Sequence, residues 1–261
     1  MNSASDLKAE TRVASCEKHG DYTANVMALL SSEIVSSCPA CEAEEAKSKA
    51  EKQKSDLDYR VKQAIVSIVP PRFHGCTLES YQAETKEQRR ALAICKKYAS
   101  NWESRRKAGG CLVLCGKPGT GKTHLAAAVM TSVIPMCMPE NNGWGSVPSV
   151  IYATAMQLTR AVKSTYAKDS QETESQVIAR YSDSNLLVID EVGGNRNTDA
   201  ELLILQEVID NRYQRVLPTI MVSNLPESEL TDYIGERALD RMYDNGGAVI
   251  AFDWDSHRRA K

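Results

Sequence analysis

Eight consecutive residues, Gly116 to Thr123, have the types and spacing needed to bind a polyphosphate. They read GKPGTGKT, follow the apolar run 111–115 and precede the helix-forming run 125–129. Glycines let successive backbone N–H groups point at one anion, and the positive end of the following helix strengthens the field there. Lys122 is expected to reach the β and γ phosphates of a nucleotide, and Thr123 to hold Mg²⁺. The predicted nucleotide-binding loop comprises Gly116, Lys117, Pro118, Gly119, Thr120, Gly121, Lys122, Thr123 and His124.

Acidic and amide side chains follow two later apolar runs. Asp190 and Glu191 come after the run 186–189, and Asn224 comes after the run 219–223. Because the carboxyl ends of parallel strands share one sheet edge, Asp190 is expected to hold Mg²⁺ through water. Glu191 is expected to polarise the attacking water, and Asn224 to contact the γ phosphate or that water. The alternatives are an acid that caps a turn and an ordinary turn asparagine.

Four metal-ligating residues lie near the amino end. Cys16 and His19 form a C-x2-H pair, and Cys38 and Cys41 form a C-P-x-C pair. Three thiolates and one imidazole suit one tetrahedral Zn²⁺, which would supply folding energy that the few apolar residues of this segment do not. The alternative is two unrelated thiol pairs in an exposed tail.

The chemistry requires elements that place these groups at one edge of a sheet. Beyond residue 70 the chain alternates short apolar runs with helix-forming segments, which predicts an α/β fold with a parallel sheet covered on both faces. Five strands are expected, at 111–115, 150–153, 186–190, 219–223 and 248–252. Helices are expected at 87–105, 122–133, 155–167 and 200–212, with a loop at 143–148.

Length and composition suggest one main α/β domain with a small additional segment. We predict a zinc-binding module at 1–45, a charged helical linker at 46–69 and an ATPase domain at 70–261. The net charge of -2 argues against a generally basic surface for nucleic acid but allows a local basic groove. The sequence lacks a long apolar span and a signal-peptide core, so we expect a cytoplasmic protein without membrane contact whose eight cysteines are thiols or metal ligands.

The order of the phosphate loop, the Asp-Glu strand end and the polar strand end resembles the AAA+ ATPases. The later segments GERALDRM (235–242) and FDWDSHR (252–258), with PPRF (70–73) upstream, are similar to the DnaC/DnaI helicase loaders, in a phage- or prophage-like variant with a zinc module. This resemblance implies an AAA+ P-loop fold with a reduced C-terminal lid. It also implies an arginine finger at Arg241 and a second sensor at Arg258, although Arg237 lies on the same helical face as Arg241.

The resemblance further implies partners. Residues 1 to about 65 would bind a hexameric DnaB-like replicative helicase, and self-association into an AAA+ assembly would complete each nucleotide site. An inserted helix, here 157–166, would contact single-stranded DNA through Arg160, Lys163 and Tyr166, whose charges follow phosphates and whose ring stacks on a base. The alternative for this helix is an ordinary amphipathic surface helix.

Other functions share the same phosphate loop. An IstB-type transposition helper ATPase would bind DNA and a transposase, and the segments at 235–242 and 252–258 favour the loader over it. A small-molecule kinase would need a lid that the sequence does not indicate, and a structural DNA-binding protein would not need both Lys122 and Glu191. The sequence lacks the N-K-x-D motif that reads guanine, which favours ATP over GTP.

Overall fold

The structure is a computed structural model that describes residues 10–29, 32–138, 149–194 and 199–257. Contacts divide the chain into unit 1, Met1–Arg60, and unit 2, Val61–Lys261, and each unit is described by itself. The predicted loop at 143–148 and the predicted sensor Arg258 lie outside the described residues. None of the described helices is long and apolar enough to cross a membrane.

Unit 1 begins with a small antiparallel sheet that sequence analysis did not predict. Its strands β1 (Glu10–Cys16), β2 (Gly20–Leu29) and β3 (Ser32–Val35) lie in the order β1-β2-β3. Gly20 has a φ of 77° where β2 begins, a left-handed conformation that favours glycine in a tight hairpin. Ala24 is fully buried, whereas most described side chains of these strands are exposed. The sheet therefore has very little apolar core of its own.

Helix α1 (Pro39–Ile68) contains the charged segment predicted to be helical. It ends just before Pro70 and Pro71, as expected from the restriction that proline places on the preceding residue. In the part that belongs to unit 2, Ala64 is buried and Ile65 and Ile68 pack against the core.

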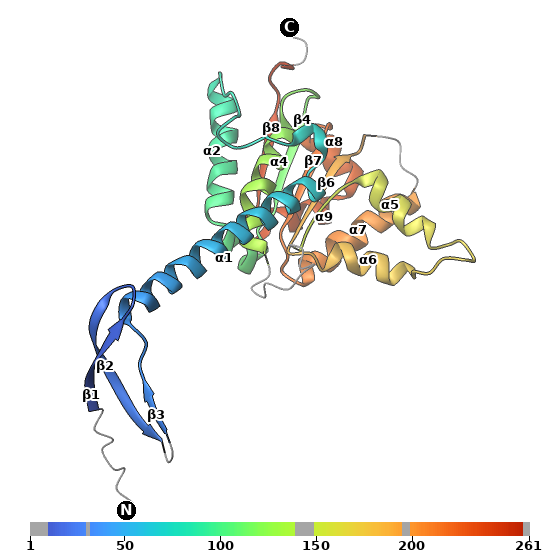
Figure 1. Cartoon of the computed structure of the whole chain (residues 1–261). Coiled ribbons are helices and arrows are strands. Elements are labelled where there is room, and N and C mark those ends of the chain that lie inside the picture. Colours follow the sequence, from blue (N-terminus) through green and yellow to red (C-terminus); the bar gives the residue numbers. More distant parts are fainter. Residues whose placement is uncertain (1–9, 30–31, 139–148, 195–198, 258–261) are drawn as a thin grey trace, which may run out of the picture. The chain divides into compact units, whose positions relative to one another are not determined.

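Unit 2 is built on a parallel sheet of five strands, which confirms the predicted fold class. The strands are β4 (Leu112–Gly116), β5 (Val150–Thr154), β6 (Leu186–Val192), β7 (Thr219–Ser223) and β8 (Ala248–Phe252). They lie in the order β5-β6-β7-β4-β8, so β4 is flanked by β7 and β8 (Figure 1). This order places the phosphate loop after β4 at the same sheet edge as the polar ends of β6 and β7.

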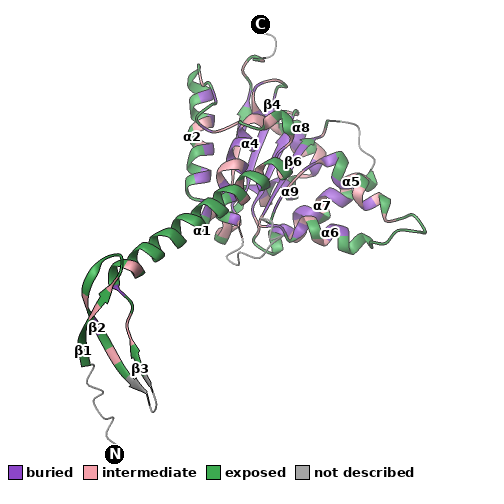
Figure 2. Cartoon of the chain, viewed as in Figure 1, coloured by how far each residue is buried: buried purple, intermediate pink, exposed green. Residues whose placement is uncertain are grey.

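Helices cover both faces of this sheet (Figures 1 and 2). In β4, Leu112 and Leu114 point to one face, and Val113 and Cys115 point to the other. The first face packs against α2 (Lys86–Ser100), α3 (Trp102–Ala108) and α4 (Lys122–Val133). The second face packs against α5 (Ala155–Ser164), α6 (Glu174–Ser182), α7 (Asp199–Gln214), α8 (Glu227–Ile234) and α9 (Glu236–Tyr243). Short 3₁₀ turns are η1 (Pro71–Phe73), η2 (Ile134–Cys137) and η3 (Asp244–Gly246).

Several helices differ from the prediction. The helix expected at 87–105 is divided into α2 and α3, because Asn101 has φ -100° and ψ 24° and breaks the helical backbone. The helix expected to reach residue 167 ends at Ser164. Helices α6 and α8 were not predicted, because segments of nine and eight residues give only a short periodic pattern.

A buried arginine hydrogen-bonds to the segments that precede β6 and β7, at the amino ends of these strands. Arg212 of α7 is 1% exposed, and its guanidinium donates to the carbonyls of Tyr181 (2.9 Å), Ser184 (2.8 Å) and Pro218 (2.6 Å). Its Nε also donates to Thr219 Oγ1 at 2.9 Å. Burial lowers the pKa of Arg212 to about 10, so it remains charged at neutral pH.

We expect Arg212→Met to lower the free energy of unfolding of unit 2 by roughly 3 to 5 kcal/mol, because several buried carbonyls lose a charged donor. Denaturant unfolding followed by circular dichroism measures this change. The matched control is Arg215→Met, which removes an arginine that is 49% exposed and pairs with Asp183. That change should cost less than about 1 kcal/mol. Equal losses in the two variants would contradict a special role for Arg212.

Candidate nucleotide and metal sites

A cavity of about 480 Å³ lies at the predicted nucleotide site. Its lining brings together residues from the predicted phosphate loop, the end of β6 and the end of β7. From the predicted set it includes Pro118, Gly119, Gly121, Lys122, Thr123, His124, Asp190, Glu191 and Asn224. The volume lies within the range of pockets that hold small ligands.

The loop before α4 has the backbone that a phosphate cradle requires. Gly119 and Gly121 have φ values of 79° and 96°, which L residues with side chains rarely adopt. A Cβ at Gly121 would also lie 2.8 Å from Tyr81 Cε2. Two independent constraints, the backbone angle and the neighbouring ring, therefore require glycine at this position.

The two lysines of the loop differ in direction. Lys122 is 4% exposed, and its Nζ donates to the carbonyls of Gly116 (2.8 Å) and Lys117 (2.6 Å). Lys117 is exposed, and its Nζ donates to the carbonyl of Asp253 at 2.7 Å. Only the first of these lysines lines the cavity.

Asp190 is held by hydrogen bonds at both carboxylate oxygens. Tyr152 of β5 donates its hydroxyl to Oδ2 at 2.6 Å, and the backbone N–H of Glu191 donates to Oδ1 at 2.7 Å. Asp190 is 4% exposed, so its orientation depends on these donors. Burial, followed by the charge of Asp190, raises the pKa of Tyr152, which therefore stays a donor at neutral pH.

Glu191 differs from its neighbour in both backbone and exposure. It is exposed and has a φ of 57°, an uncommon conformation for a non-glycine residue that is concentrated at functional sites. The turn is closed by a hydrogen bond from the N–H of Gly194 to the carbonyl of Glu191 at 3.1 Å. The side chain reaches the cavity without being buried. On β7, Ser223 is buried and the next residue, Asn224, is exposed at the cavity.

Residues that were not predicted to belong to the nucleotide site also contact the loop. Tyr81 and Trp254 both donate to the carbonyl of Thr120, at 3.3 and 3.0 Å. The backbone N–H of His257 donates to the carbonyl of Gly119 at 3.1 Å. His124 lies edge-on to Tyr81, with ring centroids 5.4 Å apart, and burial lowers the pKa of His124. Trp254 and His257 lie in the segment 252–258, which sequence analysis singled out only for its resemblance to helicase loaders, and no local pattern indicated Tyr81.

The two arginines of α9 have different surroundings. Arg241 forms an ion pair with Asp210 and lies over the ring of Tyr213, with its Cζ 5.1 Å from the centroid. Its side chain is 12% exposed, whereas Arg237 is exposed. Both line a second cavity of about 600 Å³ on the surface of unit 2. The choice of arginine finger between these two residues stays a prediction.

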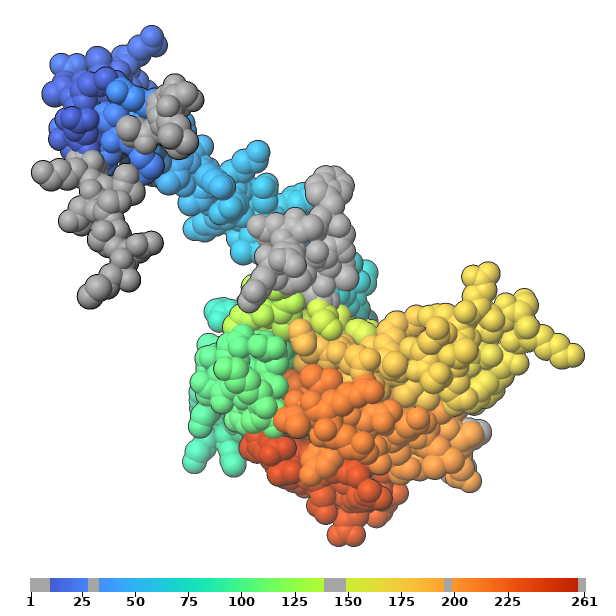
Figure 3. Space-filling view, turned by 90° about the horizontal axis from the view of Figure 1, so that it is seen from below, coloured from blue at the N-terminus to red at the C-terminus, as the bar shows by residue number. Residues whose placement is uncertain are grey.

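The predicted DNA-contacting helix corresponds to α5 and the turn that follows it. Arg160 is exposed, Lys163 forms an ion pair with Glu201 at 2.8 Å, and Tyr166 is 61% exposed. The hydroxyl of Tyr166 donates to Glu174 at 3.3 Å. The chain between α5 and α6 projects from the rest of unit 2, as the yellow segment in Figure 3 shows. The ring of Tyr166 is accessible for stacking, whereas the charge of Lys163 is already paired with Glu201.

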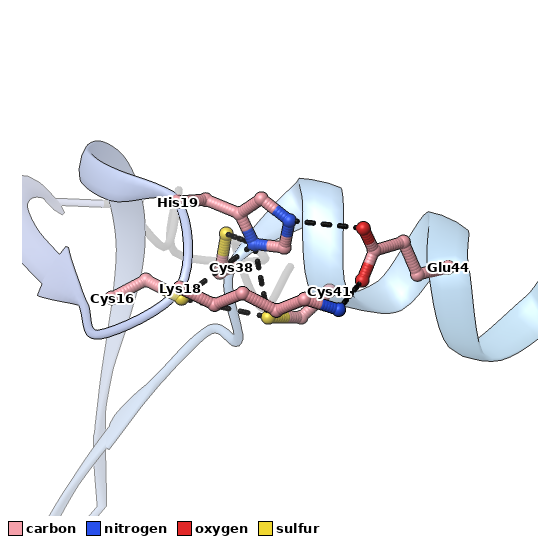
Figure 4. Close-up of polar contacts among 6 residues, drawn as sticks. All are labelled: Cys16, Lys18, His19, Cys38, Cys41 and Glu44. Carbon is pink, nitrogen blue, oxygen red and sulfur yellow. Dashed lines mark hydrogen bonds and ion pairs between the residues drawn. The ribbon is translucent and has the colours of Figure 1, made fainter.

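In unit 1, the four predicted zinc ligands converge (Figure 4). Their ligand atoms all lie within 4.8 Å of one another. Nδ1 of His19 lies 3.7, 3.8 and 3.3 Å from the Sγ atoms of Cys16, Cys38 and Cys41. Around a tetrahedral zinc ion, a thiolate and an imidazole nitrogen are about 3.5 Å apart. The donor set and its spacing therefore fit Zn²⁺.

The surroundings of the cluster also suit a metal ligand set. Glu44 accepts from Nε2 of His19 at 3.1 Å and also pairs with Lys18, and a carboxylate on the distal nitrogen fixes the ring for metal binding (Figure 4). Backbone hydrogen bonds from Lys18 and His19 are the main causes that lower the pKa of Cys16 to about 6. The neighbouring Cys41 has a raised pKa because it faces Cys16. Close thiolates repel one another, which a bound dication relieves.

Comparison with known proteins gives the family. The model of the family described as IstB-like ATP binding protein matches residues 47–259. The chain belongs to this ATP-binding family. Relatives include the replicative helicase loader DnaC of Escherichia coli (strain K12), which is 31% identical over 74% of this chain and 73% of the relative. The loader DnaC of Buchnera aphidicola subsp. Baizongia pistaciae is 32% identical over 72% and 71% of the two chains. The predicted resemblance to helicase loaders is thus confirmed.

Solved structures confirm the AAA+ P-loop fold of this family member. The crystal structure of the DnaC helicase loader matches 70% of this chain and 100% of its own, with a TM-score of 0.58 and 20% identity. AMPPCP-bound DnaA from Aquifex aeolicus matches 73% of this chain and 53% of its own, with a TM-score of 0.55 and 21% identity. These likenesses establish the fold.

Proposed function

We propose that this protein is an ATP-dependent loader that binds a DnaB-like replicative helicase and assists its deposition on single-stranded DNA. The observation that carries the proposal is the 31% identity to replicative helicase loaders over about three quarters of both chains. The cavity that unites Lys122, Asp190 and Asn224 supports the nucleotide-dependent part. ATP binding and hydrolysis would switch assembly and release through unequal affinity for the two states.

The residues that line the cavity would have different roles in ATP hydrolysis. The loop N–H groups and Lys122 would hold the phosphates, and Glu191 would take the proton of the attacking water. Thr123 and Asp190 would hold Mg²⁺, which neutralises charge on the phosphates. An arginine of α9, Arg241 or Arg237, would act on the nucleotide of a neighbouring copy, and Arg258 would act as the second sensor. Turnover would then be slow until copies assemble or DNA binds.

We predict that Tyr152→Phe raises the Mg²⁺ concentration needed for half-maximal ATP hydrolysis by roughly tenfold, because groups that orient a metal ligand commonly contribute this much. Nucleotide binding without Mg²⁺ should not change, since Tyr152 does not line the cavity. The matched control is Tyr98→Phe, which removes a buried hydroxyl that donates to the carbonyl of Gly110 at 2.9 Å. An unchanged Mg²⁺ requirement in Tyr152→Phe would contradict the positioning role.

Unit 1 is the proposed helicase-docking module. Val13, Met27 and Ile34 are 69, 63 and 54% exposed. The register pairs Val13 with Thr23 and Met27 with Ile34, so their side chains share one face of the sheet. Exposed apolar residues grouped on one face commonly mark a protein contact. The face is therefore proposed to receive the helicase, with zinc holding the sheet to the start of α1.

The test is co-purification of the tagged full-length protein with the replicative helicase of its source cell, in ATP and in ADP. A chain starting at residue 61 is the comparison, because this boundary keeps Ala64 and Ile65 in the core of unit 2. ATP hydrolysis by the shorter chain verifies that it is folded. Helicase bound only by the full-length protein supports the proposal. Failure of the full-length protein to bind helicase would refute it.

A transposition helper of the IstB type is the second candidate, favoured by the description of the matching family model. It would use the same ATP site and would bind a transposase in place of a helicase. Recovery of a transposase in the same co-purification would select this function. The nucleotide chemistry of unit 2 would be unaffected by that outcome.

A further inference from the structure

Helix α2 carries a one-sided stripe of positive charge. Its outward residues Lys86, Arg89, Arg90, Lys96 and Lys97 are all exposed. At 3.6 residues per turn, these five side chains fall within an arc of about 120° around the helix axis. The helix is described throughout its length, and its one acidic residue, Glu87, lies outside this arc. We name these five residues the α2 stripe.

This concentration of charge departs from the rest of the chain. The whole sequence has 32 basic and 34 acidic residues, so a face with five basic and no acidic side chains is a local exception. The opposite face of α2, with Ala91, Cys95 and Tyr98, is buried against the core of unit 2 (Figure 2). A rigid helix therefore presents the stripe, and its cations keep a fixed spacing.

The stripe has the properties of a surface for the backbone of a polyanion. From Lys86 to Lys97 the stripe extends about 16 Å along the helix axis, so its cations span several successive phosphates. Among the described residues, none of the stripe cations is in an ion pair of unit 2, and Arg89 donates to the carbonyl of Glu84 at 2.6 Å. Their charges are therefore available to replace the counterions of a phosphate chain.

Two observations favour duplex DNA over a membrane surface or a single strand. No large apolar side chain of α2 is exposed, whereas helices that lie on membranes insert an apolar face into the lipid. The stripe also has no aromatic residue, whereas surfaces for single strands commonly stack bases on aromatic rings. A duplex offers the denser row of phosphates and needs no stacking partner.

We propose that the α2 stripe binds the phosphate backbone of duplex DNA without reading its sequence. The stripe lies on the face of the sheet that packs α2 and α4, opposite to the face that packs α5. It is therefore separate from the predicted single-strand contacts of Arg160, Lys163 and Tyr166. Unit 2 would hold a duplex on one face while the single-stranded segment lies on the other. This binding does not depend on the helicase or on ATP hydrolysis.

The test measures binding of the full-length protein to a short labelled duplex by fluorescence anisotropy over a range of salt. The variant combines Lys86→Gln, Arg90→Gln and Lys97→Gln. Loss of three phosphate contacts should weaken duplex binding roughly tenfold or more and make the slope of log affinity against log salt shallower by about three. The matched control combines Lys47→Gln, Lys49→Gln and Lys52→Gln on exposed positions of α1, which removes the same net charge.

Five outcomes decide the proposal. A loss in the stripe variant alone, with unchanged basal ATP hydrolysis, supports it. An equal change in both variants, or no change in either, overturns it. A loss confined to a single strand of the same sequence also overturns it, as does stripe-dependent binding to phosphatidylserine vesicles without any for the duplex. Failure to bind helicase would refute the proposed function and leave this result unaffected.

Discussion

Lys122→Ala is expected to reduce ATP affinity by two to three orders of magnitude and to abolish measurable hydrolysis. Lys122 is 4% exposed, and its ammonium already donates to the loop carbonyls of Gly116 and Lys117, at 2.8 and 2.6 Å. Charge-assisted hydrogen bonds to two phosphates contribute on the order of 4 kcal/mol, which corresponds to roughly a thousandfold in affinity. Titration with a fluorescent ATP analogue measures the binding, and phosphate release measures the hydrolysis.

The same loop supplies the control. Lys117→Ala removes an identical charge five residues away, but this side chain donates to the carbonyl of Asp253 and does not line the cavity. We expect the affinity of Lys117→Ala to fall by less than about tenfold, since its charge acts on the nucleotide only through solvent. Thermal melting should show that both variants are folded. Tight ATP binding by Lys122→Ala would contradict the site.

The sheet of unit 2 and much of its site could be predicted because the relevant signals are local. Each parallel strand is buried on both faces and is therefore a short apolar run, and the functional side chains follow directly after these runs. The glycines at 119 and 121 mark the loop because the backbone there requires positive φ. Strand ends and loop positions together specify which edge of the sheet carries the candidate site.

The other residues around the candidate site are positioned by contacts between segments that lie far apart in the sequence. Tyr152 meets Asp190 because β5 pairs with β6 in a register that places Thr154 opposite Asp190. Tyr81 and Trp254 come from opposite ends of the sequence of unit 2, and both donate to the carbonyl of Thr120. Neither contact leaves a periodic pattern in the sequence. The strands of unit 1 were missed for a different reason, because a sheet with little core lacks the apolar alternation that indicates strands.

Combining Cys38→Ser with Cys41→Ser is expected to remove zinc from the protein and to unfold unit 1. The wild-type protein should contain one zinc ion per chain. Structural zinc contributes about 10 to 16 kcal/mol to the folding of small modules. In unit 1 the small core centred on Ala24 and Cys38 cannot replace that contribution. Elemental analysis measures the zinc, and amide hydrogen exchange of residues 10–38 measures the folding.

A control variant and a measurement of helicase binding distinguish the effect of losing the metal from the effect of losing a thiol. Cys76→Ser removes a thiol outside the cluster and should keep the zinc, since the four residues of the cluster are enough for a tetrahedral shell. Because the ATP site is built entirely from unit 2, the double variant should keep ATP binding while it loses helicase binding. Slow amide exchange in a zinc-free wild-type protein would contradict the metal's role in folding. Helicase binding by a zinc-free, unfolded unit 1 would instead place the docking surface on unit 2.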